Sequence, residues 1–421
     1  MSAATPTSSP AIDAGRRHVV VIGAGVVGVA SAIEALRAGL AVTLLDPHAS
    51  GSPEAASYGN AGWLSSHSVI PPAGPDTWRQ VPGYLLDPQG PLALRWGYLP
   101  RALPWLVRYL LSGRTPERVA RAAHALRALL QDAPALHQRL AQEAGCAELI
   151  EQRGLLHVYP DRAAFKADGL GWRLRRNEDI AFDTLDADAL RAAEPDLAAR
   201  YQFGVRVPEA GHCRNPGAYV AALAAHAQTL GAVRVAARAT SQGDIDCQAT
   251  VLAAGAWSAP LAAAAGDRVS LDTERGYHVM ADLPGPPGPR TPTMVMDRKF
   301  IAHQMAHGLR VAGQVEIGGL SAAPDWRRAA ILRAQLAETY PALPRDALQE
   351  AKLWMGRRPS TPDGLPCIGA ASGCADVIHA YGHGHIGLGS SARTGRVVAQ
   401  LLAGQPPEID LAPFSPQRWR R

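Results

Sequence analysis

The sequence predicts an α/β fold in which one domain is interrupted by a second domain of helices and antiparallel strands. Residues 18–46 follow the pattern strand, glycine-rich turn, helix and strand, which marks the start of an α/β domain. Residues 249–258 form another apolar run that ends in small residues and indicates a return to that domain. Short apolar runs separated by Pro/Gly turns at 269–320 predict an antiparallel sheet in the inserted domain.

The segment His18–Asp46 has the features of a dinucleotide-binding unit. Gly23 suits the tight turn, Gly25 allows the backbone to approach a pyrophosphate, and Gly28 allows close packing of helix on strand. The first helical turn offers free N–H groups and a positive dipole end to phosphates. Asp46 ends the second strand, where a carboxylate can accept hydrogen bonds from both hydroxyls of a ribose. These residues predict a bound nucleotide whose ribose carries no phosphate.

Composition excludes several classes of protein. The 421 residues, 47% of them hydrophobic, suggest two or three domains. The net charge of +5 is modest, and no basic run with interleaved aromatic residues predicts a nucleic-acid partner. No run of 18 apolar residues predicts a membrane span. We therefore expect a cytoplasmic protein, either free or attached to the surface of the inner membrane.

The residues that commonly bind metals do not form a metal-binding pattern. The five cysteines contain no CxxC pair, so reduced, buried thiols in a reducing compartment are expected. His303 and His307 are four residues apart, but no acidic residue lies at ligand spacing. We interpret them as loop or strand residues and predict no metal.

Changes of composition and periodicity divide the chain into segments. The nucleotide-binding domain is predicted in three parts, at 17–91, 213–267 and 353–410. The inserted substrate domain is predicted at 151–212 and 268–352, a helical layer at 92–150, and a disordered lead at 1–16.

Residues 92–114 mix Trp, Tyr, Leu and Arg. The pattern favours one or two short helices divided by Pro100 and Pro104. Two interpretations stay open: a helical layer that covers the domain, or an arginine-edged apolar face that dips into a membrane surface.

Other patterns predict individual elements. Helices are expected at 116–144, 163–176, 186–194, 215–231, 325–336 and 391–402. Strands are expected at 154–159, 201–210, 233–239, 277–280, 293–296, 300–302 and 309–312, with a polar turn at 242–244.

Two glycine-rich segments remain. The loop 57–62 gathers small residues against which a flat ring could lie, although a plain loop is the alternative. The segment 381–389 ends in a turn that feeds a helix and directs its N–H groups at an electron-rich atom.

Five ordered motifs resemble the D-amino acid oxidase superfamily of flavoproteins, and most of all the bacterial D-amino acid dehydrogenases. They are GAGVVG with Asp46, SYGNAG, VLAAGAWS, GRRPSTPDGLPCIG and YGHGHIGLG, and the similarity spans about 18–405. The resemblance implies FAD and a Rossmann-type domain with an inserted antiparallel substrate domain. The turn between Val233 and Ala249 is shorter than the hairpin of the relatives.

The resemblance also implies roles for residues of this chain. Arg358 corresponds to the arginine that clamps the substrate carboxylate, and Arg357 stands beside it where relatives carry an apolar residue. Tyr277 is expected to shape the pocket or to bond the carboxylate, and His385 is placed with the catalytic group. The expected cofactor-binding residues are Gly23, Gly25, Val26, Val27, Gly28, Asp46, Pro47, Ser57, Asn60, Ala61, Gly62, Ala254, Gly255, Trp257, Gly382, His383, Gly384, His385, Ile386, Gly387 and Leu388.

The implied reaction is oxidative deamination of D-amino acids to 2-keto acids and ammonia. A hydride passes from Cα to flavin N5, no obligatory general base is needed, and a quinone or another acceptor takes the electrons. One alternative is an oxidase or dehydrogenase of glycine, sarcosine or D-hydroxyproline. A second is a flavin-binding subunit of a larger amine-oxidising complex.

Overall fold

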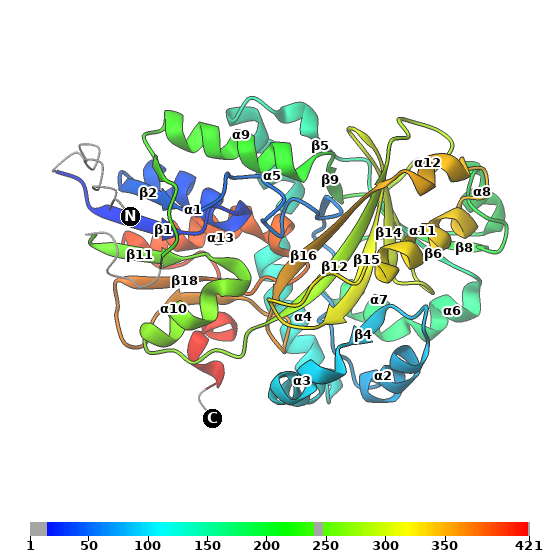
Figure 1. Ribbon diagram of the computed structural model, residues 1–421, viewed down its shortest axis with the longest axis horizontal. Helices are drawn as coiled ribbons and strands as arrows, with labels where there is room; N and C mark the ends of the chain where they lie inside the picture. The colour runs from blue at the N-terminus through cyan, green and yellow to red at the C-terminus, as the bar shows by residue number, and fades with distance from the viewer. Residues whose placement is uncertain (1–14, 240–246, 420–421) are drawn as a thin grey trace, which may run out of the picture.

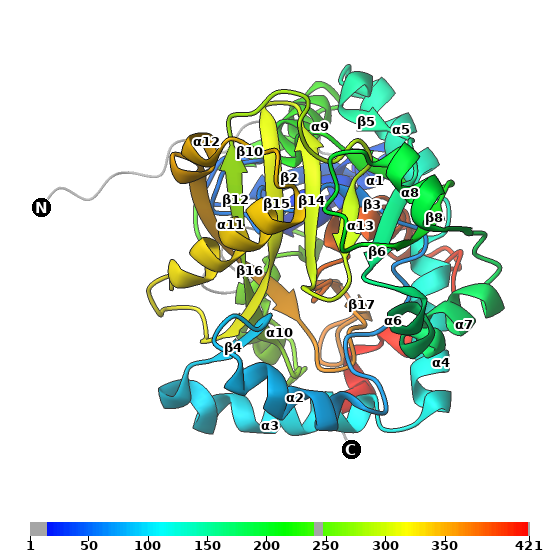
Figure 2. The same ribbon diagram turned by 90° about the vertical axis from the view of Figure 1, so that its right-hand side faces the viewer.

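Two large β-sheets form the body of the molecule. The computed structural model describes residues 15–239 and 247–419. In Figure 1 the first sheet lies at the left between helices, and the second lies at the right as a broad, twisted layer. Segments far apart in the sequence meet in both sheets, as the mixture of colours within each sheet shows in Figures 1 and 2.

The first sheet has six strands in the order β10-β2-β1-β11-β18-β17, parallel except for β17. Alternate residues of the central strand face opposite ways: Val19 and Val21 enter one core, and Val20 and Ile22 enter another. The predicted return of the chain is confirmed, because Ala249 lies opposite Val19 in parallel register. The strands are β1 (His18–Ile22), β2 (Ala41–Leu45), β10 (Val233–Val235), β11 (Ala249–Leu252), β17 (Cys367–Ala370) and β18 (Val377–Tyr381).

Helices cover both faces of this sheet. On one face pack α1 (Val26–Arg37), α5 (Ala133–Glu143), α9 (Pro216–Thr229) and α13 (Gly387–Leu402). On the other lies α10 (Ser258–Ala264), which directly follows η3 (Gly255–Trp257). Helices α1 and α13 approach closely, because a Cβ at Gly395 would stand 2.7 Å from the carbonyl group of Ala30. The parallel sheet is thus buried on both sides, as its continuous apolar strands require.

The second sheet has nine strands, with the order β16-β12-β15-β14-β13-β6-β8-β7 and β4 paired with β15. Most neighbours are antiparallel, but β13 runs parallel to β6 and β15 parallel to β4. Helix α11 (Arg327–Thr339) packs on β12 and β15. The strands are β4 (Leu92–Leu94), β6 (Leu155–Tyr159), β7 (Asp183–Leu185), β8 (Phe203–Val207), β12 (Asp272–Ala281), β13 (Thr293–Val295), β14 (Phe300–Met305), β15 (Gly308–Ile317) and β16 (Lys352–Ser360).

Strand β16 corrects one expected boundary. The sequence assigned 353–410 to the nucleotide-binding domain, yet residues 352–360 pair along their whole length with β12 of the second sheet. The chain therefore passes from the second sheet to the first only after Ser360. Strand β16 belongs to the second sheet, which forms the predicted substrate domain.

Smaller elements complete the fold. Strands β3 (Trp63–Leu64), β5 (Ile150–Glu151) and β9 (Gly211–Cys213) form a small antiparallel sheet. The remaining helices are α2 (Thr77–Leu86), α3 (Leu99–Ser112), α4 (Pro116–Leu130), α6 (Arg162–Ala167), α7 (Gly169–Asn177), α8 (Ala187–Ala193) and α12 (Arg345–Gln349). Single 3-10 turns are η1 (Trp96–Tyr98), η2 (Ala147–Leu149), η4 (Ala412–Phe414) and η5 (Pro416–Trp419).

Two predicted helices are each divided. The pattern at 116–144 forms α4 and α5, because Asp132 adopts a left-handed backbone with φ of 60° and the second helix then begins at Ala133, with Pro134 in its first turn. The pattern at 163–176 forms α6 and α7, with the break at Asp168, whose carboxylate accepts a hydrogen bond from the Tyr159 hydroxyl at 2.8 Å. Amphipathic periodicity continues across both breaks and so conceals them.

The prediction for residues 92–114 was wrong in detail. Residues 92–94 form β4, and one helix, α3, then runs through both prolines. Pro100 lies in the first turn, where its missing N–H costs nothing, and Pro104 removes only one hydrogen bond. Trp105 anchors the helix, since it is buried and its Nε1 donates to the Ser360 carbonyl at 3.0 Å.

Some predicted segments differ in length from the structure or lie outside the residues that it describes. Strand β10 ends at Val235, earlier than the predicted 239, and the turn predicted at 242–244 and residues 1–14 lie outside them. Within 15–239 and 247–419 no helix combines the length and apolar character needed to cross a bilayer. The same residues contain no group of three His, Cys, Asp or Glu side chains that could hold a metal, and His303 lies in β14.

Candidate functional site

A cavity of about 730 Å³ lies between the two large sheets, at the carboxyl ends of β1, β2, β11 and β18. This is the edge at which open α/β sheets bind their ligands. The predicted residues that line it are Gly23, Gly25, Val26, Val27, Asp46, Pro47, Ser57, Asn60, Ala61, Ala254, Gly255, Trp257, Tyr277, Arg358, His383, Gly384, His385, Ile386, Gly387 and Leu388. Gly28, Gly62 and Gly382 are not among the residues of its wall.

The glycine turn after β1 is shaped by three different constraints. Gly23 has φ of +105°, and a Cβ there would overlap the carbonyl group of Ala253. A Cβ at Gly28 would overlap the carbonyl oxygen of Gly23, so this glycine serves packing behind the wall. Gly25 has no heavy atom within 4 Å of its Cβ position and faces the open cavity. The N-terminus of α1 therefore adjoins an open space, which suits an anion.

Asp46 is oriented by the backbone at the end of β2. Its two carboxylate oxygens accept hydrogen bonds from the N–H groups of Ala24 and His48, each at 2.8 Å. A carboxylate has about four acceptor positions, so both oxygens can still accept bonds from a ligand. Asp46 lies at the cavity wall beside Pro47, and its contact with a ribose stays a prediction.

The loop 57–62 and the turn before α13 form two further parts of the wall. The hydroxyl of Ser57 is buried there without a hydrogen-bond partner among the described residues. Gly62, with φ of +83°, does not line the cavity, and a Cβ there would overlap the carbonyl oxygen of Cys213. Helix α13 begins at Gly387, so its free N–H groups and positive dipole end adjoin the cavity.

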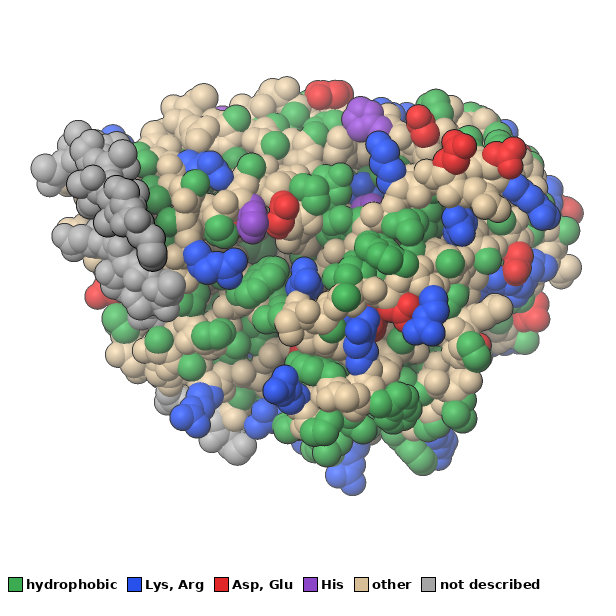
Figure 3. Space-filling model, in the orientation of Figure 1, with side chains coloured by type: hydrophobic (Ala, Val, Ile, Leu, Met, Phe, Trp, Pro, Cys, Tyr) green, Lys and Arg blue, Asp and Glu red, His purple; other side chains and the backbone are tan. Residues whose placement is uncertain are grey.

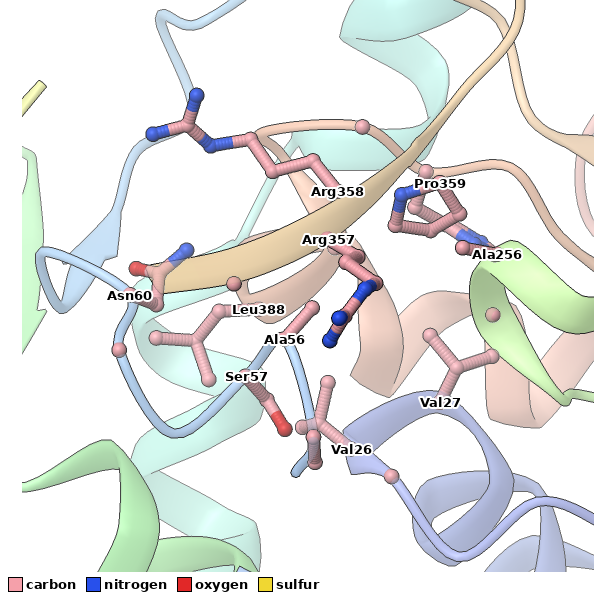
Figure 4. A pocket seen from close by; sticks show the side chains of 18 of the residues that line it. Val26, Val27, Ala56, Ser57, Asn60, Ala256, Arg357, Arg358, Pro359 and Leu388 are labelled. Atoms are coloured by element: carbon pink, nitrogen blue, oxygen red, sulfur yellow. The ribbon is translucent and has the colours of Figure 1, made fainter. Parts of the chain in front are cut away.

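Strand β16 brings two arginines to the cavity from opposite sides of the strand. Figure 4 shows Arg357 directed toward Val26 and Ala56, and Arg358 directed away from them. Arg357 donates from Nε to the Leu320 carbonyl at 2.8 Å. Both arginines line the cavity, so lining the cavity does not distinguish them. They differ in the part of the cavity that each side chain reaches.

Arg358 lies across the second sheet. Its guanidinium occupies the space above Gly276, where a Cβ would overlap it, and its Nη1 donates to the Gln314 carbonyl at 3.2 Å. Burial lowers the pKa of Arg358, and the nearby Glu274 raises it again, so the side chain stays a cation at neutral pH. Most of its donors remain available for a planar acceptor such as a carboxylate.

Tyr277 corrects part of the prediction. Its hydroxyl donates to Glu316 at 2.5 Å and accepts the Asp325 N–H at 2.9 Å. Burial and Glu316 together raise the pKa of Tyr277 to about 12. Tyr277 is among the residues of the cavity wall, but its ring packs in the core with residues of α11, and its hydroxyl is already engaged and does not bond a substrate carboxylate as it stands.

The two histidines before α13 are neutral at physiological pH. His385 is exposed to the cavity, and the surrounding protein, with a smaller effect from the charge of Arg358, lowers its pKa to about 4. Burial lowers the pKa of His383 to about 3, and its Nε2 lies 3.2 Å from the Thr394 hydroxyl. His385 shapes the wall as an uncharged ring, and His383 is held by packing.

Buried histidines make stability depend on pH. Burial lowers the pKa of His137 to about 4 and those of His278 and His383 to about 3. Below pH about 6.5 the unfolded chain binds protons that the folded state excludes, so acidification lowers the free energy of unfolding. The expected loss is up to about 1.4 kcal/mol per histidine per pH unit between about pH 6 and 4. Urea unfolding at several pH values measures this loss of free energy. In a His137→Gln variant the slope of the free energy of unfolding against pH should correspond to about one proton fewer taken up on unfolding. A free energy of unfolding that is constant over this range would contradict the prediction.

Several wall residues were not predicted from the sequence. On the second sheet they include Met294, Lys299, Ile301, Ala312, Gln314 and Trp354, which come from β13 to β16 and the turns between them. The period of two along these strands indicates two faces, but it does not show which face meets a cavity formed by another domain.

Known proteins identify the family. A family model described as FAD dependent oxidoreductase matches residues 18–401. The chain belongs to the family of FAD-dependent oxidoreductases. FAD is therefore its cofactor, and the predicted resemblance and fold class are confirmed.

This oxidoreductase resembles named relatives over nearly its whole length. It is 58% identical to a D-amino-acid oxidase of Bradyrhizobium diazoefficiens, over 96% of this chain and 99% of the relative. It is 30% identical to a D-amino acid dehydrogenase of the same organism, over 95% and 98% of the two chains. Its fold matches glycine oxidase from Geobacillus kaustophilus with a TM-score of 0.69, 23% identity, and coverage of 96% and 99%.

Features of the cavity wall itself fit FAD. The N-termini of α1 and α13 both adjoin it, and Gly25 leaves room for a close ligand. The buried hydroxyl of Ser57 has no hydrogen-bond partner among the described residues, and a polar ligand would supply one.

Proposed function

We propose that this FAD-dependent oxidoreductase deaminates D-amino acids to 2-keto acids and ammonia. The observation that carries the proposal is Arg358, a half-buried guanidinium held above Gly276 on the wall of the FAD cavity. Such a fork suits the carboxylate of an amino acid. Support comes from the relatives, which bear the names D-amino-acid oxidase and D-amino acid dehydrogenase.

The proposed cofactor contacts follow the wall. Gly23, Gly25 and the N-terminus of α1, with Val26 and Val27, hold the pyrophosphate. Asp46 binds the ribose, while the loop 57–61 and residues 383–388 surround the flavin ring. Bound FAD supplies an acceptor for the hydride that leaves the substrate Cα.

The protein's own residues orient the substrate. Arg358 binds the carboxylate and so holds the Cα–H bond in one position, which makes the step effectively unimolecular. The amine reacts in its neutral form after losing a proton to solvent, so we assign no general base. The positive end of α13 stabilises negative charge that develops at its N-terminus. The imino acid leaves and is hydrolysed by water.

Anaerobic reduction of the yellow protein tests this function. Absorbance near about 450 nm, where a flavin is expected to absorb, is followed with D- and L-amino acids, glycine, sarcosine and hydroxyprolines. Bleaching by D-amino acids alone supports the proposal. Bleaching only by glycine, sarcosine or hydroxyproline would replace it with the corresponding amine oxidation, and no bleaching by any amine would favour a flavin-binding subunit.

The electron acceptor is the second part of the proposal. We propose a quinone or an electron-transfer protein at a membrane surface, supported by an apolar face on α2 and α3. Figure 3 shows hydrophobic side chains with arginines among them in the region where Figure 1 places these helices. The exposed apolar residues are Trp78, Leu86, Trp96, Leu103, Val107, Leu110 and Leu111, and Arg79, Arg101, Arg108 and Arg114 are exposed with them. Apolar and cationic groups together suit an anionic lipid surface.

Replacing Trp96, Leu103 and Val107 by Ser should abolish sedimentation with vesicles of anionic phospholipid. Dye-linked oxidation should stay within about twofold of the original, because these side chains are exposed and lie outside the cavity wall. Leu230→Ser, an exposed apolar position at the end of α9, is the matched control. Vesicle binding that is unchanged in the triple variant would exclude this face. Rapid recovery of the reduced protein in air, with peroxide, would indicate oxygen as the acceptor.

A further inference from the structure

The loop 58–61 is held from behind by side chains of the second sheet. Arg310 on β15 donates from Nη1 to the carbonyls of Asn60 at 2.6 Å and Tyr58 at 3.3 Å. His278 on β12 lies 3.2 Å from the Gly59 carbonyl through Nδ1, and His303 on β14 lies 2.8 Å from the Ala61 carbonyl. Four consecutive carbonyls of one loop are thus bound by three side chains from three strands. We call Arg310, His278 and His303 the carbonyl clamp.

The clamp stands directly behind the cavity wall. Gly59, Asn60 and Ala61 line the cavity, and their carbonyl groups are those that the clamp binds. A carbonyl oxygen only accepts, so each imidazole presents an N–H to it. Trp354 packs on Tyr58 and Gly59 of the same loop, and the hydrogen bonds of the clamp fix the position of its four carbonyl groups.

Arg310 differs from the two histidines because it carries charge. It is 5% exposed, its Nε has no partner, and no carboxylate within the described ranges forms an ion pair with it. Burial lowers the pKa of Arg310 only to about 10, so it remains a cation at neutral pH. Burial holds the pKa of both histidines far below 6.5, so they are neutral. Among the described residues, the carbonyls of Tyr58 and Asn60 accept hydrogen bonds from this buried cation. A buried charge acts strongly on a nearby group in a low dielectric.

We propose that Arg310 is a positioning residue that fixes the loop 58–61 against the flavin ring, and that its buried charge favours the reduced, more negative cofactor. The inference rests on the placement of the ring beside this loop in the proposed function. A preorganised cation behind the wall stabilises negative charge without any reorganisation during the reaction. The two histidines supply position without charge.

The experiment compares the reduction potentials of FAD-loaded variants. Each variant is equilibrated with a reference dye while a separate enzyme, and not an amine substrate, supplies the electrons. Arg310→Gln keeps N–H donors for the loop but removes the charge. It should shift the reduction equilibrium at least about tenfold toward oxidised flavin, which is about 30 mV for a two-electron couple. Arg310→Lys keeps the charge and should stay within about threefold of the original equilibrium.

Two further variants separate position from charge. His303→Leu removes the hydrogen bond to the Ala61 carbonyl without changing the charge. It should weaken FAD binding about tenfold and leave the reduction potential unchanged. Arg298→Met removes a cation from the turn between β13 and β14, where it is already paired with Glu338, and is the control. An unchanged potential in Arg310→Gln, or an equal shift in Arg310→Lys, would overturn the proposal. Because no amine is used, a wrong substrate assignment would leave these potentials intact.

Discussion

Replacing Arg358 by Met is expected to lower kcat/KM for D-amino acids by about 10³-fold, with FAD still bound at full occupancy. The change removes the guanidinium that lies above Gly276 and hydrogen-bonds Gln314. Loss of a charge-assisted, bidentate contact to a carboxylate costs about 4 kcal/mol, which corresponds to this factor. Steady-state dye reduction measures kcat/KM, and the absorbance ratio of flavin to protein measures occupancy.

Two neighbouring variants make this prediction specific. Arg357→Met, on the other side of β16, should affect FAD retention more than substrate affinity, because its side chain is directed toward Val26. Gly276→Ala keeps Arg358 but displaces its guanidinium, so it should raise KM with a smaller effect on folding. If Arg357→Met lost as much kcat/KM as Arg358→Met at full FAD occupancy, the carboxylate would be assigned to the wrong arginine.

Replacing Gly28 by Val is expected to yield a folded protein that has lost most of its FAD. A Cβ at this position would overlap the Gly23 carbonyl oxygen, which is backbone and cannot turn aside. Helix α1 must therefore move away from β1, and its N-terminus leaves the position that suits a pyrophosphate. We expect the Kd for FAD to rise by about 10²-fold or more, equivalent to about 2.7 kcal/mol.

Fluorescence titration of the apoprotein with FAD measures this change. Gly25→Ala tests the same turn by another route, because its Cβ enters the open cavity and would exclude ligand without moving the helix. Gly83→Ala, in α2 and with no atom within 4 Å of its Cβ position, is the control and should bind FAD normally. Stoichiometric FAD in purified Gly28→Val would show that close packing of α1 on β1 is not required.

Much of the cofactor end of this protein could be predicted because its signals are local. The glycine turn, the strand before it, the helix after it and Asp46 lie within 18–46, and each has a physical reason at its own position. On the second sheet, a wall residue could be predicted only where a motif marks it, as at Arg358. The helix breaks at Asp132 and Asp168 were missed because hydrophobic periodicity does not report a single change of backbone conformation.

The sequence by itself determined the family, the FAD cofactor and the α/β fold, and most of the site residues that it predicted lie at the cavity wall. Only the tertiary structure decided that Arg357 and Arg358 face different parts of one cavity, and that Glu316 engages the hydroxyl of Tyr277. It alone brought Arg310, His278 and His303 behind the loop 58–61. The reason is that these contacts join strands separated by long stretches of chain. Their register and the face that each presents are fixed by packing between sheets, which no local pattern encodes.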